Sequence, residues 1–517
     1  MCYVALGRDQ VTCLHDLNGD DEADFYECAT NAMITSPGGH SFITGLDADS
    51  QGRFYFASAN QGVCRATASS VEVLATGFRN PNGLGISPDA RFVTSSVQEG
   101  DWTPASAVCQ IEMGKNQGAH FGAGGPRNGQ PPEPPLLYLP RGEDNSSGGQ
   151  CFITGDAWSA LKGDGNFIHL STGTGSAWLV MRQQVGDRWQ AAAVRMSGNF
   201  DSGVQGGRFN ARDGQFYVSG MQGWGTYTPL DGCFQRVRFT GGGTPVPIAF
   251  EARDNGVLLR FETPLDASIA AATANHFAQC WNYRYSAAYG SPEFSVLHPG
   301  SIGHDPLEIR SAQVLDDGKT LFLEIPQLLP ANQIHLHIAV TKERAHDVFL
   351  SAHALAAPFT AFPGYGAIAK TVHAVQTAPA TVNFLPVKWE RGEGGRELHL
   401  QTANGLQFAQ KELRAKAGEH LSLIFENPDV LPHNWVLMRP DAIERVGALA
   451  NNLIAAPDAL ARHYVPDSAD ILCHTRVLEP QKKTTIHFSA PTQAGRYPYA
   501  CTFPGHWAVM RGMLIVE

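Results

Sequence analysis

The sequence predicts an all-β protein built from a β-propeller, an Ig-like β-sandwich and a C-terminal β-sandwich. Three observations predict this class. A strand motif recurs along the first half, alternating strands follow from about residue 244, and cysteine, histidine and methionine stand at strand ends near the C-terminus. The 517 residues include 54 Gly and 32 Pro, which suits many short strands joined by turns. With 43% hydrophobic and 17% charged residues, the chain has the composition of a globular protein.

A repeated strand motif predicts a β-propeller over residues 1–243. Each copy reads Gly or Ala, a polar or basic residue and Phe, and the copies begin at Gly52, Ala90, Gly165 and Gly214. The starts are 38, 75 and 49 residues apart, so the long interval has room for one diverged copy. Cys2–Leu6 resembles a further copy, in a truncated first blade. Six copies about 40 residues apart fit six blades. An open array of β-sandwiches is the alternative.

Polar residues just before these strands form a candidate site in the propeller. They lie in Gly-rich segments, and the inner strands of a propeller border its central channel. The candidates are His40, Asn82, Gln150 and Gln205. We expect them to converge in the channel, where amides suit hydrogen bonding to a neutral, sugar-like ligand. The alternative is that they are turn residues with satisfied side chains.

An acidic segment near the N-terminus has the spacing of a calcium-binding loop. Oxygen-bearing side chains occupy positions 1, 3, 5, 9 and 12, namely Asp16, Asn18, Asp20, Asp24 and Glu27. Position 6, where such loops carry Gly, is Asp21, and no flanking helices are evident. A solvated hairpin loop is therefore the alternative to a Ca²⁺ site.

Strand patterns change after the propeller. Alternating or buried runs predict an Ig-like β-sandwich over 244–354; they are Pro245–Phe250, Gly256–Phe261, Leu321–Ile325 and Ile334–Ile338. Residues 355–395 are rich in Ala, Pro, Gly and Thr, which predicts a linker. A last domain then spans 396–517.

Within that last domain, strand and turn signals bring a cysteine and two histidines together. Cys501 ends an alternating run, so it lies at a strand end. Thr502–Gly505 is turn chemistry and brings His506 back beside Cys501. His433 follows the run Leu421–Phe425 and comes from a neighbouring strand.

These residues, with a methionine, form a recognisable ligand set. Two imidazoles, one thiolate and a weak thioether bind copper in blue-copper electron-transfer sites. Zinc prefers a fourth strong ligand, and Met is a poor one. Buried core residues without a metal are the other alternative. The sequence therefore predicts one mononuclear copper held by His433, Cys501, His506 and Met510.

The last domain resembles azurin and is identified as a member of the plastocyanin/azurin family of cupredoxins. The resemblance is carried by His433–Leu437, His474-Thr475, Cys501–His506 and Met510–Leu514. It implies a Greek-key β-sandwich, three trigonal ligands of a type 1 copper (His433, Cys501 and His506) and an axial Met510. It also implies that the backbone N–H of Asn434 reaches the Cys501 sulfur, and that the edge of His506 reaches solvent through an apolar patch.

Two departures and one insertion stand out against the azurin pattern. Pro432 stands where azurin has Gly, and the domain has no cysteine pair matching azurin's disulfide. Asp441 is a plausible N-cap for an insertion with apolar residues at helical spacing, from Ile443 to Leu453. This segment predicts a helical flap outside the sandwich.

The propeller carries a second resemblance. Asn80–Asp89 resembles the blade motif of NHL-like and soluble PQQ sugar-dehydrogenase-like six-bladed propellers. Two functional classes follow. In the first, the chain is an electron-transfer protein whose propeller docks it to a redox partner, such as a cytochrome c or a dehydrogenase, or binds a ligand. In the second, the propeller is a sugar or alcohol dehydrogenase, PQQ-dependent under this alternative, that passes electrons to the copper. Multicopper oxidases are disfavoured because no His flanks Cys501.

Net charge, hydropathy and the expected copper centre limit the possible binding partners and the cellular location of the protein. The net charge of −11 argues against nucleic acid, whose phosphates require an excess of Lys and Arg. No apolar run has the length of a membrane helix. Copper centres of this kind occur outside the reducing cytoplasm, so we expect a periplasmic or secreted protein. Met1–Ala5 is not a signal peptide, and we expect the export signal in a missing N-terminal part.

Overall fold

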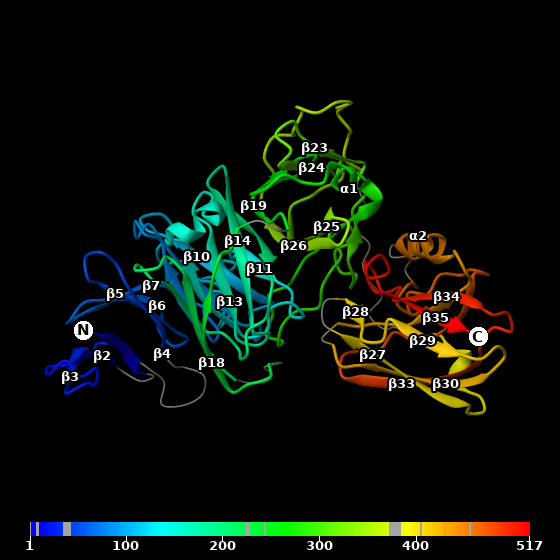
Figure 1. The fold of residues 1–517 in the computed structure, drawn as a ribbon, viewed down its shortest axis with the longest axis horizontal. Coiled ribbons are helices and arrows are strands. Elements are labelled where there is room, and N and C mark those ends of the chain that lie inside the picture. Colours follow the sequence, from blue (N-terminus) through cyan, green and yellow to red (C-terminus); the bar gives the residue numbers. More distant parts are fainter. Residues whose placement is uncertain are drawn as a thin grey trace. The chain divides into compact units, whose positions relative to one another are not determined.

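The computed structural model confirms the all-β class and divides the chain into two compact units (Figure 1). It describes all residues except 1, 7–9, 35–42, 223–227, 242–243, 372–383, 404–405, 430, 454–455 and 457. The first unit comprises 1–278, 283–292 and 308–370, and the second comprises 279–282, 293–307 and 371–517. No helix among the described residues has the length and apolar character needed to cross a membrane.

The first unit begins with successive antiparallel sheets, as expected for propeller blades. The first sheet contains β1 (Cys2–Leu6), β2 (Gln10–His15) and β3 (Phe25–Thr30). The second contains β4 (Ile43–Ala48), β5 (Phe54–Ser58), β6 (Gly62–Ala66) and β7 (Val71–Ala75). The third contains β8 (Leu84–Ile86), β9 (Phe92–Val97), β10 (Ser106–Glu112) and β11 (Leu137–Leu139).

Two further sheets continue this series. The fourth contains β12 (Ser147–Phe152), β13 (Phe167–Ser171), β14 (Ser176–Val185) and β15 (Arg188–Arg195), with the short helix η1 (Asp156–Leu161) between β12 and β13. The fifth contains β16 (Gly206–Phe209), β17 (Phe216–Met221) and β18 (Gly232–Val237). The first strands of consecutive sheets, from β1 to β16, contact one another and form the inner wall.

The repeated motif marks the second strand of four of these sheets. Its Phe begins β5, β9, β13 and β17, and every residue of β9 and β13 is buried. The predicted extra copy between Ala90 and Gly165 is not there. The described residues 113–136 form a long strand-free connection from β10 to β11 instead. The interval of 75 residues is therefore long because of this connection and not because of an added blade.

The strands between residues 244 and 354 divide between two sheets. One has the order β19 (Pro247–Arg253), β20 (Gly256–Phe261), β24 (Thr320–Glu324) and β23 (Ser311–Val314). The hairpin of β25 (Ala331–Thr341) and β26 (Arg344–Ala352) joins β15 instead, with Ala192 opposite Leu350. The helices α1 (Ala267–Ala270) and η2 (Thr273–Asn275) lie between β20 and β21 (His276–Trp281).

From residue 396 on, the second unit is a two-sheet sandwich, coloured yellow to red in Figure 1. One sheet has the order β28 (Gln407–Phe408), β27 (Arg396–Ala403), β30 (His420–Asn427) and β33 (Lys482–Ser489). The other has the order β29 (Glu412–Ala415), β35 (Arg511–Val516), β34 (Gly495–Ala500), β31 (Val436–Met438) and β32 (Ile471–His474). Leu398 and Leu400 point into the core while their neighbours on β27 are exposed, the alternation of a half-buried strand.

A helix and a distant loop complete this unit. Helix α2 (Ile443–Leu453) is the predicted flap, and it buries Val446, Ala450 and Leu453. The short helix η3 (Lys388–Glu390) precedes β27. Residues 279–282 and 293–307 also belong to this unit, although they are distant in sequence. They pair where β21 ends and β22 (Asp305–Pro306) begins, with Cys280 opposite Asp305. We call these two stretches the cap.

Candidate metal centre

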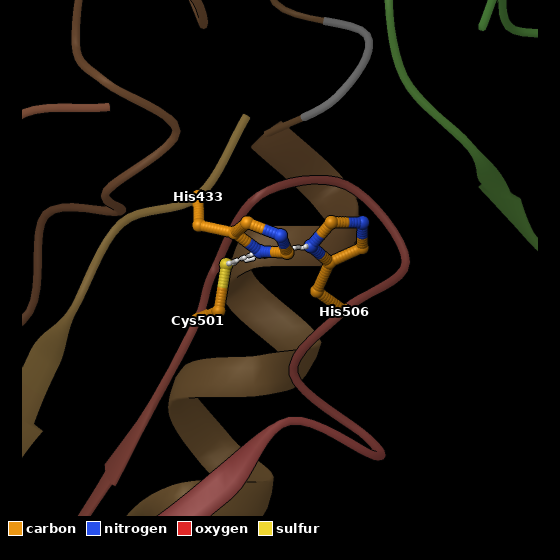
Figure 2. Close-up of side chains that lie close together, drawn as sticks. All are labelled: His433, Cys501 and His506. Carbon is orange, nitrogen blue, oxygen red and sulfur yellow. Dashed lines mark hydrogen bonds between the residues drawn. The ribbon is translucent and has the colours of Figure 1, made fainter. Parts of the chain in front are cut away.

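Three of the predicted ligands meet at one end of the sandwich (Figure 2). Cys501 directly follows β34, His506 lies on the loop to β35, and His433 precedes β31. The Cys501 Sγ is 3.7 Å from the His433 Nδ1 and 3.5 Å from the His506 Nδ1. The two Nδ1 atoms are 3.2 Å apart, and all three side chains are fully buried. The site therefore presents one sulfur and two nitrogens to a common point.

This triangle has the size of a metal site. Metal–nitrogen bonds of about 2.0 Å and metal–sulfur bonds of about 2.3 Å, the lengths found for zinc, put trigonal donor atoms about 3.5 to 3.7 Å apart. The observed separations of 3.2 to 3.7 Å agree with this. Within the described part of the chain, this group holds three His, Cys or acidic residues and no fourth. The donor set fits a trigonal copper site better than a structural zinc site.

The loop from Cys501 to Met510 is closed by its own backbone. A turn forms where the His506 N–H donates to the Phe503 carbonyl, 3.0 Å away. Met510 donates to the His506 carbonyl at 2.8 Å, and the Cys501 N–H donates to the Met510 carbonyl at 3.1 Å. Met510 is fully buried. The backbone of the predicted axial residue is thus tied directly to two of the three predicted trigonal ligands.

Asn434 braces the two halves of the site. Its backbone N–H lies 3.4 Å from the Cys501 sulfur. Its side-chain oxygen accepts from the Thr502 N–H at 2.7 Å, and its amide nitrogen donates to the Thr502 hydroxyl at 2.9 Å and to the His463 carbonyl at 2.8 Å. One buried amide therefore links the segment before β31, which carries His433, to the segment after β34, which carries Cys501.

A carboxylate that sequence reasoning missed orients the first histidine. The Asp429 Oδ2 lies 3.0 Å from the His433 Nε2, and both side chains are buried. With Nε2 donating to the carboxylate, Nδ1 is left to face Cys501 and His506. The signal available in the sequence was an acidic residue four positions before a predicted ligand.

Comparisons with known proteins match the last part of the chain to copper proteins. Residues 397–517 match the family model described as copper binding proteins, plastocyanin/azurin family. Auracyanin-A of Chloroflexus aurantiacus is 33% identical over 134 residues, which are 26% of this chain and 75% of that protein. Azurin-1 of Alcaligenes xylosoxydans xylosoxydans is 31% identical over 120 residues, 22% of this chain and 89% of that protein.

The chain belongs to the plastocyanin/azurin family of copper-binding proteins. Among solved structures, auracyanin A of Chloroflexus aurantiacus matches 24% of this chain and 100% of its own, at 30% identity and a TM-score of 0.22. The "putative oxidoreductase (glucose dehydrogenase)" of Thermus thermophilus matches 45% of this chain and 77% of its own, at 18% identity and a TM-score of 0.34.

Burial favours the protonated form of Cys501. Removal from water raises the pKa of Cys501 to about 12, and the N–H groups of Asn434 and Phe503 oppose this only in part. Without a metal, the side chain is therefore a neutral thiol at physiological pH. Metal binding has to displace its proton.

The expected solvent-exposed edge of His506 is wrong for this chain. His506 is 0% exposed, and Phe503 and His304 of the cap both pack against it, with ring centroids 4.9 and 5.5 Å away. Trp507, on the same loop, packs on helix α2 and donates to Asn451 at 2.8 Å. A Cβ on Gly447 would lie 2.2 Å from the Trp507 ring, so α2 needs glycine there. The predicted apolar patch is covered by the chain itself.

The structure brings three of the four predicted channel residues together. Asn82, Gln150 and Gln205 line a cavity of about 550 Å³, and the Gln205 amide donates to Asn82 at 3.3 Å. His40 lies outside the described residues. Behind Gln150, sequence reasoning missed a buried pair: Gln150 lies 3.1 Å from the His169 Nδ1, and the His169 Nε2 lies 3.0 Å from Asp144.

The predicted calcium residues lie on and beside the exposed loop between β2 and β3. Asp16 accepts from the Gly19 N–H at 2.6 Å, and Asp24 accepts from the Leu17 N–H at 2.7 Å. Asn18 donates to Asp20 at 3.0 Å, whereas Glu27 pairs with His15 at 2.8 Å. Calcium binding stays a prediction. The structure also groups Cys13, His15 and Glu27, with ligand atoms within 4.8 Å of one another, which the sequence had not indicated.

Proposed function

We propose that the second unit is a mononuclear type 1 copper centre that carries one electron at a time, held by His433, Cys501, His506 and Met510. The observation that carries the proposal is the buried triangle of one sulfur and two nitrogens, with sides of 3.2 to 3.7 Å. Bound there, copper would supply a one-electron redox couple. We also propose that the protein works outside the cytoplasm, where a copper–thiolate centre is not exposed to the reducing thiol pool.

The chain's own residues suit this task because they hold the donors rigidly and exclude water. Asp429 fixes the His433 ring, and Asn434 ties Cys501 to the segment just before β31. The loop hydrogen bonds between Cys501, His506 and Met510 fix the remaining donors. A donor set fixed in advance rearranges little when the charge of a bound metal changes.

A pair of cysteine variants tests the copper assignment. The copper-loaded protein should show the intense blue or green colour of a copper(II)–thiolate bond, at one copper per chain. Cys501→Ser should abolish the colour, because a hydroxyl is too weakly acidic to replace the thiolate. Cys473→Ser is the matched control, since Cys473 is also buried in this unit and lies on β32. A full-strength band in Cys501→Ser would overturn the proposal.

For the first unit we propose that the propeller binds a neutral, hydroxyl-rich ligand. The cavity of about 550 Å³ is lined by the amides of Asn82, Gln150 and Gln205, which donate and accept hydrogen bonds without charge, and by Arg208, whose guanidinium lies 3.5 Å from the Asp47 carboxylate. Titration calorimetry with a panel of monosaccharides should detect binding that Gln205→Ala removes. The exposed Gln222→Ala is the control, because Gln222 lies outside that lining.

A specific observation keeps the dehydrogenase alternative open. Asp144, His169 and Gln150 form a buried hydrogen-bonded chain that ends at the cavity wall, and a histidine held by a carboxylate is a common general base. If the propeller is a dehydrogenase, sugars or alcohols should bleach the copper colour after reconstitution with PQQ and calcium. Bleaching that His169→Asn prevents would establish this second function in place of simple ligand binding.

A further inference from the structure

The loop from Cys501 to Met510 is called the copper-binding loop from here on. The cap covers the face of this loop that carries His506. His304, on the cap, lies edge-on to His506, with an angle of 62° between the two rings. Ile302, also on the cap, packs against the hydrophobic core of the sandwich. The Tyr464 hydroxyl of the sandwich donates to the Ile302 carbonyl at 3.0 Å. Apolar, aromatic and hydrogen-bonding contacts therefore join the cap to the rest of the second unit.

Two glycines show how closely the surfaces fit. A Cβ on Gly505 would lie 1.8 Å from the Gln279 Oε1 of the cap. A Cβ on Gly303 of the cap would lie 2.8 Å from Pro504 of the copper-binding loop. Both glycines also have φ in the left-handed region, at +82° and +137°. Each surface therefore carries a residue without a side chain where the other approaches most closely.

His304 is held in a single orientation. Its Nδ1 lies 3.1 Å from the Gln279 Oε1, and its Nε2 contacts the Glu293 carboxylate. Its ring stacks on Trp281, with centroids 3.9 Å apart and an angle of 11° between the planes. His304 and Trp281 are 1% and 2% exposed. The group that touches His506 is therefore as fixed as a core residue.

The cap is also braced internally. The buried Asp305 carboxylate accepts from the Ser295 hydroxyl at 2.6 Å and from the N–H groups of Val296 and Leu297 at 2.6 and 2.9 Å. Phe294 bridges to both Asn282 and Ile302. Such hydrogen bonding is typical of a compact loop that keeps its shape, because opening it would expose several buried polar groups.

We propose that the cap is a built-in docking partner for the copper-binding loop. It occupies the face around His506 on which a separate redox protein would otherwise dock, and His304 is a positioning residue for the His506 ring. A protein reaching the second unit from this face meets the outer surface of the cap instead of the ligand edge. The shielding of His506 does not depend on a bound metal. Only the electron-exchange readout described below rests on the proposed copper function.

Chemical modification of the metal-free full-length protein tests the shielding. Diethyl pyrocarbonate acylates accessible imidazoles, and mass spectrometry of peptides gives a rate for each histidine. His399, whose side chain is 63% exposed, is the accessible standard, and the buried His433 is the core standard. His506 should react at least about tenfold more slowly than His399, a ratio that corresponds to about 1.4 kcal/mol of opening free energy. Equal rates for His506 and His399 would overturn the proposal.

Two cap variants should expose His506 selectively. His304→Ala removes the covering ring, and Gly303→Val adds a side chain where Pro504 lies against the cap. In both, His506 should approach the rate of His399 while His433 stays slow. His298→Ala, a change at a half-buried histidine on the same loop, should leave the His506 rate unchanged. If Gly303→Val also makes His433 reactive, that variant is unfolded and His304→Ala decides. Unchanged protection of His506 in His304→Ala would overturn the proposal.

The copper-loaded protein gives an independent second readout. Hexacyanoferrate(III) takes one electron from the reduced copper protein and becomes hexacyanoferrate(II), so stopped-flow absorbance follows the transfer directly. His304→Ala should react several-fold faster than the wild type, because the reagent comes closer to the ligand edge. An equal or slower rate in His304→Ala would contradict the cap as a shield. Failure of the protein to bind copper would overturn the proposed function but leave the modification result standing.

Discussion

Two buried carboxylate–imidazole pairs, one in each unit, have nearly the same geometry and different surroundings. Asp429 and His433 are 3.0 Å apart in the second unit, and Asp144 and His169 are 3.0 Å apart in the first. The remaining ring nitrogen of His433 faces a cysteine sulfur and a second imidazole. That of His169 faces the amide of Gln150. The pair itself therefore does not define the chemistry; the atom opposite the other nitrogen does.

Removing one imidazole from each unit should have a different effect in the two units. His169→Leu leaves the buried Asp144 with the Ser147 hydroxyl, 2.6 Å away, but without its imidazole partner, and we expect the free energy of unfolding of the first unit to fall by about 3 kcal/mol. Copper binding should be unchanged. His433→Leu should abolish copper binding. Denaturant unfolding and copper stoichiometry measure the two effects.

The double variant Asp144→Leu, His169→Leu is the control for the first unit. It should recover part of the lost stability, because it removes the unpaired charge as well as the imidazole. A loss below about 1 kcal/mol in the single variant would contradict a structural role for the Asp144–His169 pair.

The second prediction concerns the proton on Cys501. Because burial raises the pKa of Cys501 to about 12, the thiol is protonated at neutral pH and metal binding releases one proton. The apparent affinity for Zn²⁺ or Cu²⁺ should therefore rise about tenfold per pH unit between roughly pH 7 and pH 9. Competition titrations against a chelator of known pH dependence measure this slope. A flat profile would show that Cys501 is not a ligand.

The third prediction concerns the effect of the Asp429 charge on the reduction potential. Its negative charge stabilises the more positive oxidation state of a metal held by His433. Asp429→Asn keeps the hydrogen-bonding shape but removes the charge, so the reduction potential should rise by roughly 60 mV, a tenfold change in a one-electron equilibrium. Spectroelectrochemistry measures the shift. In contrast, Asp144→Asn should not move the potential, and a similar shift there would contradict a local effect.

The smallest effect is expected at another carboxylate–imidazole cluster, which is partly exposed. Asp347 lies 2.8 Å from His335 and 2.9 Å from His337, on the β25–β26 hairpin. Hydrogen bonding to Asp347 raises the pKa of His337 above its ordinary value, although burial opposes this. Burial alone would raise the pKa of Asp347, but hydrogen bonds from His335 and His337 hold it well below its usual range.

The signs of these two shifts define a pH window. The contribution of His337 is present below the ordinary histidine pKa and is lost as pH rises through the raised value. The contribution of Asp347 is present above the ordinary aspartate pKa and is lost as pH falls. Asp347→Asn should therefore destabilise the first unit most at about pH 4 to 6.5. Because half of the Asp347 side chain is exposed, the loss should stay below about 1 kcal/mol. Unfolding at pH 5.5 and pH 8.5 measures it, and an equal loss at both would contradict the pairing.

The sequence predicted the candidate metal centre more fully than the candidate site in the propeller. Cys501, His506 and Met510 lie within ten residues, so a strand end and one turn fix their spacing. Asn82, Gln150 and Gln205 lie on or just before the first strands of three separate sheets, and only a repeated motif indicated that they would meet. The same motif misled us about an extra copy between Ala90 and Gly165, because spacing alone does not distinguish a long connection from a diverged repeat.

By itself, the sequence determined the all-β class, the four strands that begin at the Phe of each motif copy, and the local arrangement of the copper-binding loop. These features depend on alternation, turn residues and chain geometry over a few residues. Only the tertiary structure decided that the β25–β26 hairpin joins β15, that Asp429 orients His433, and that the cap buries His506. His304 and His506 are separated by about two hundred residues, and no periodic pattern links them. Their contact depends on complementary packing at Gly303 and Gly505, which exists only once both surfaces have folded.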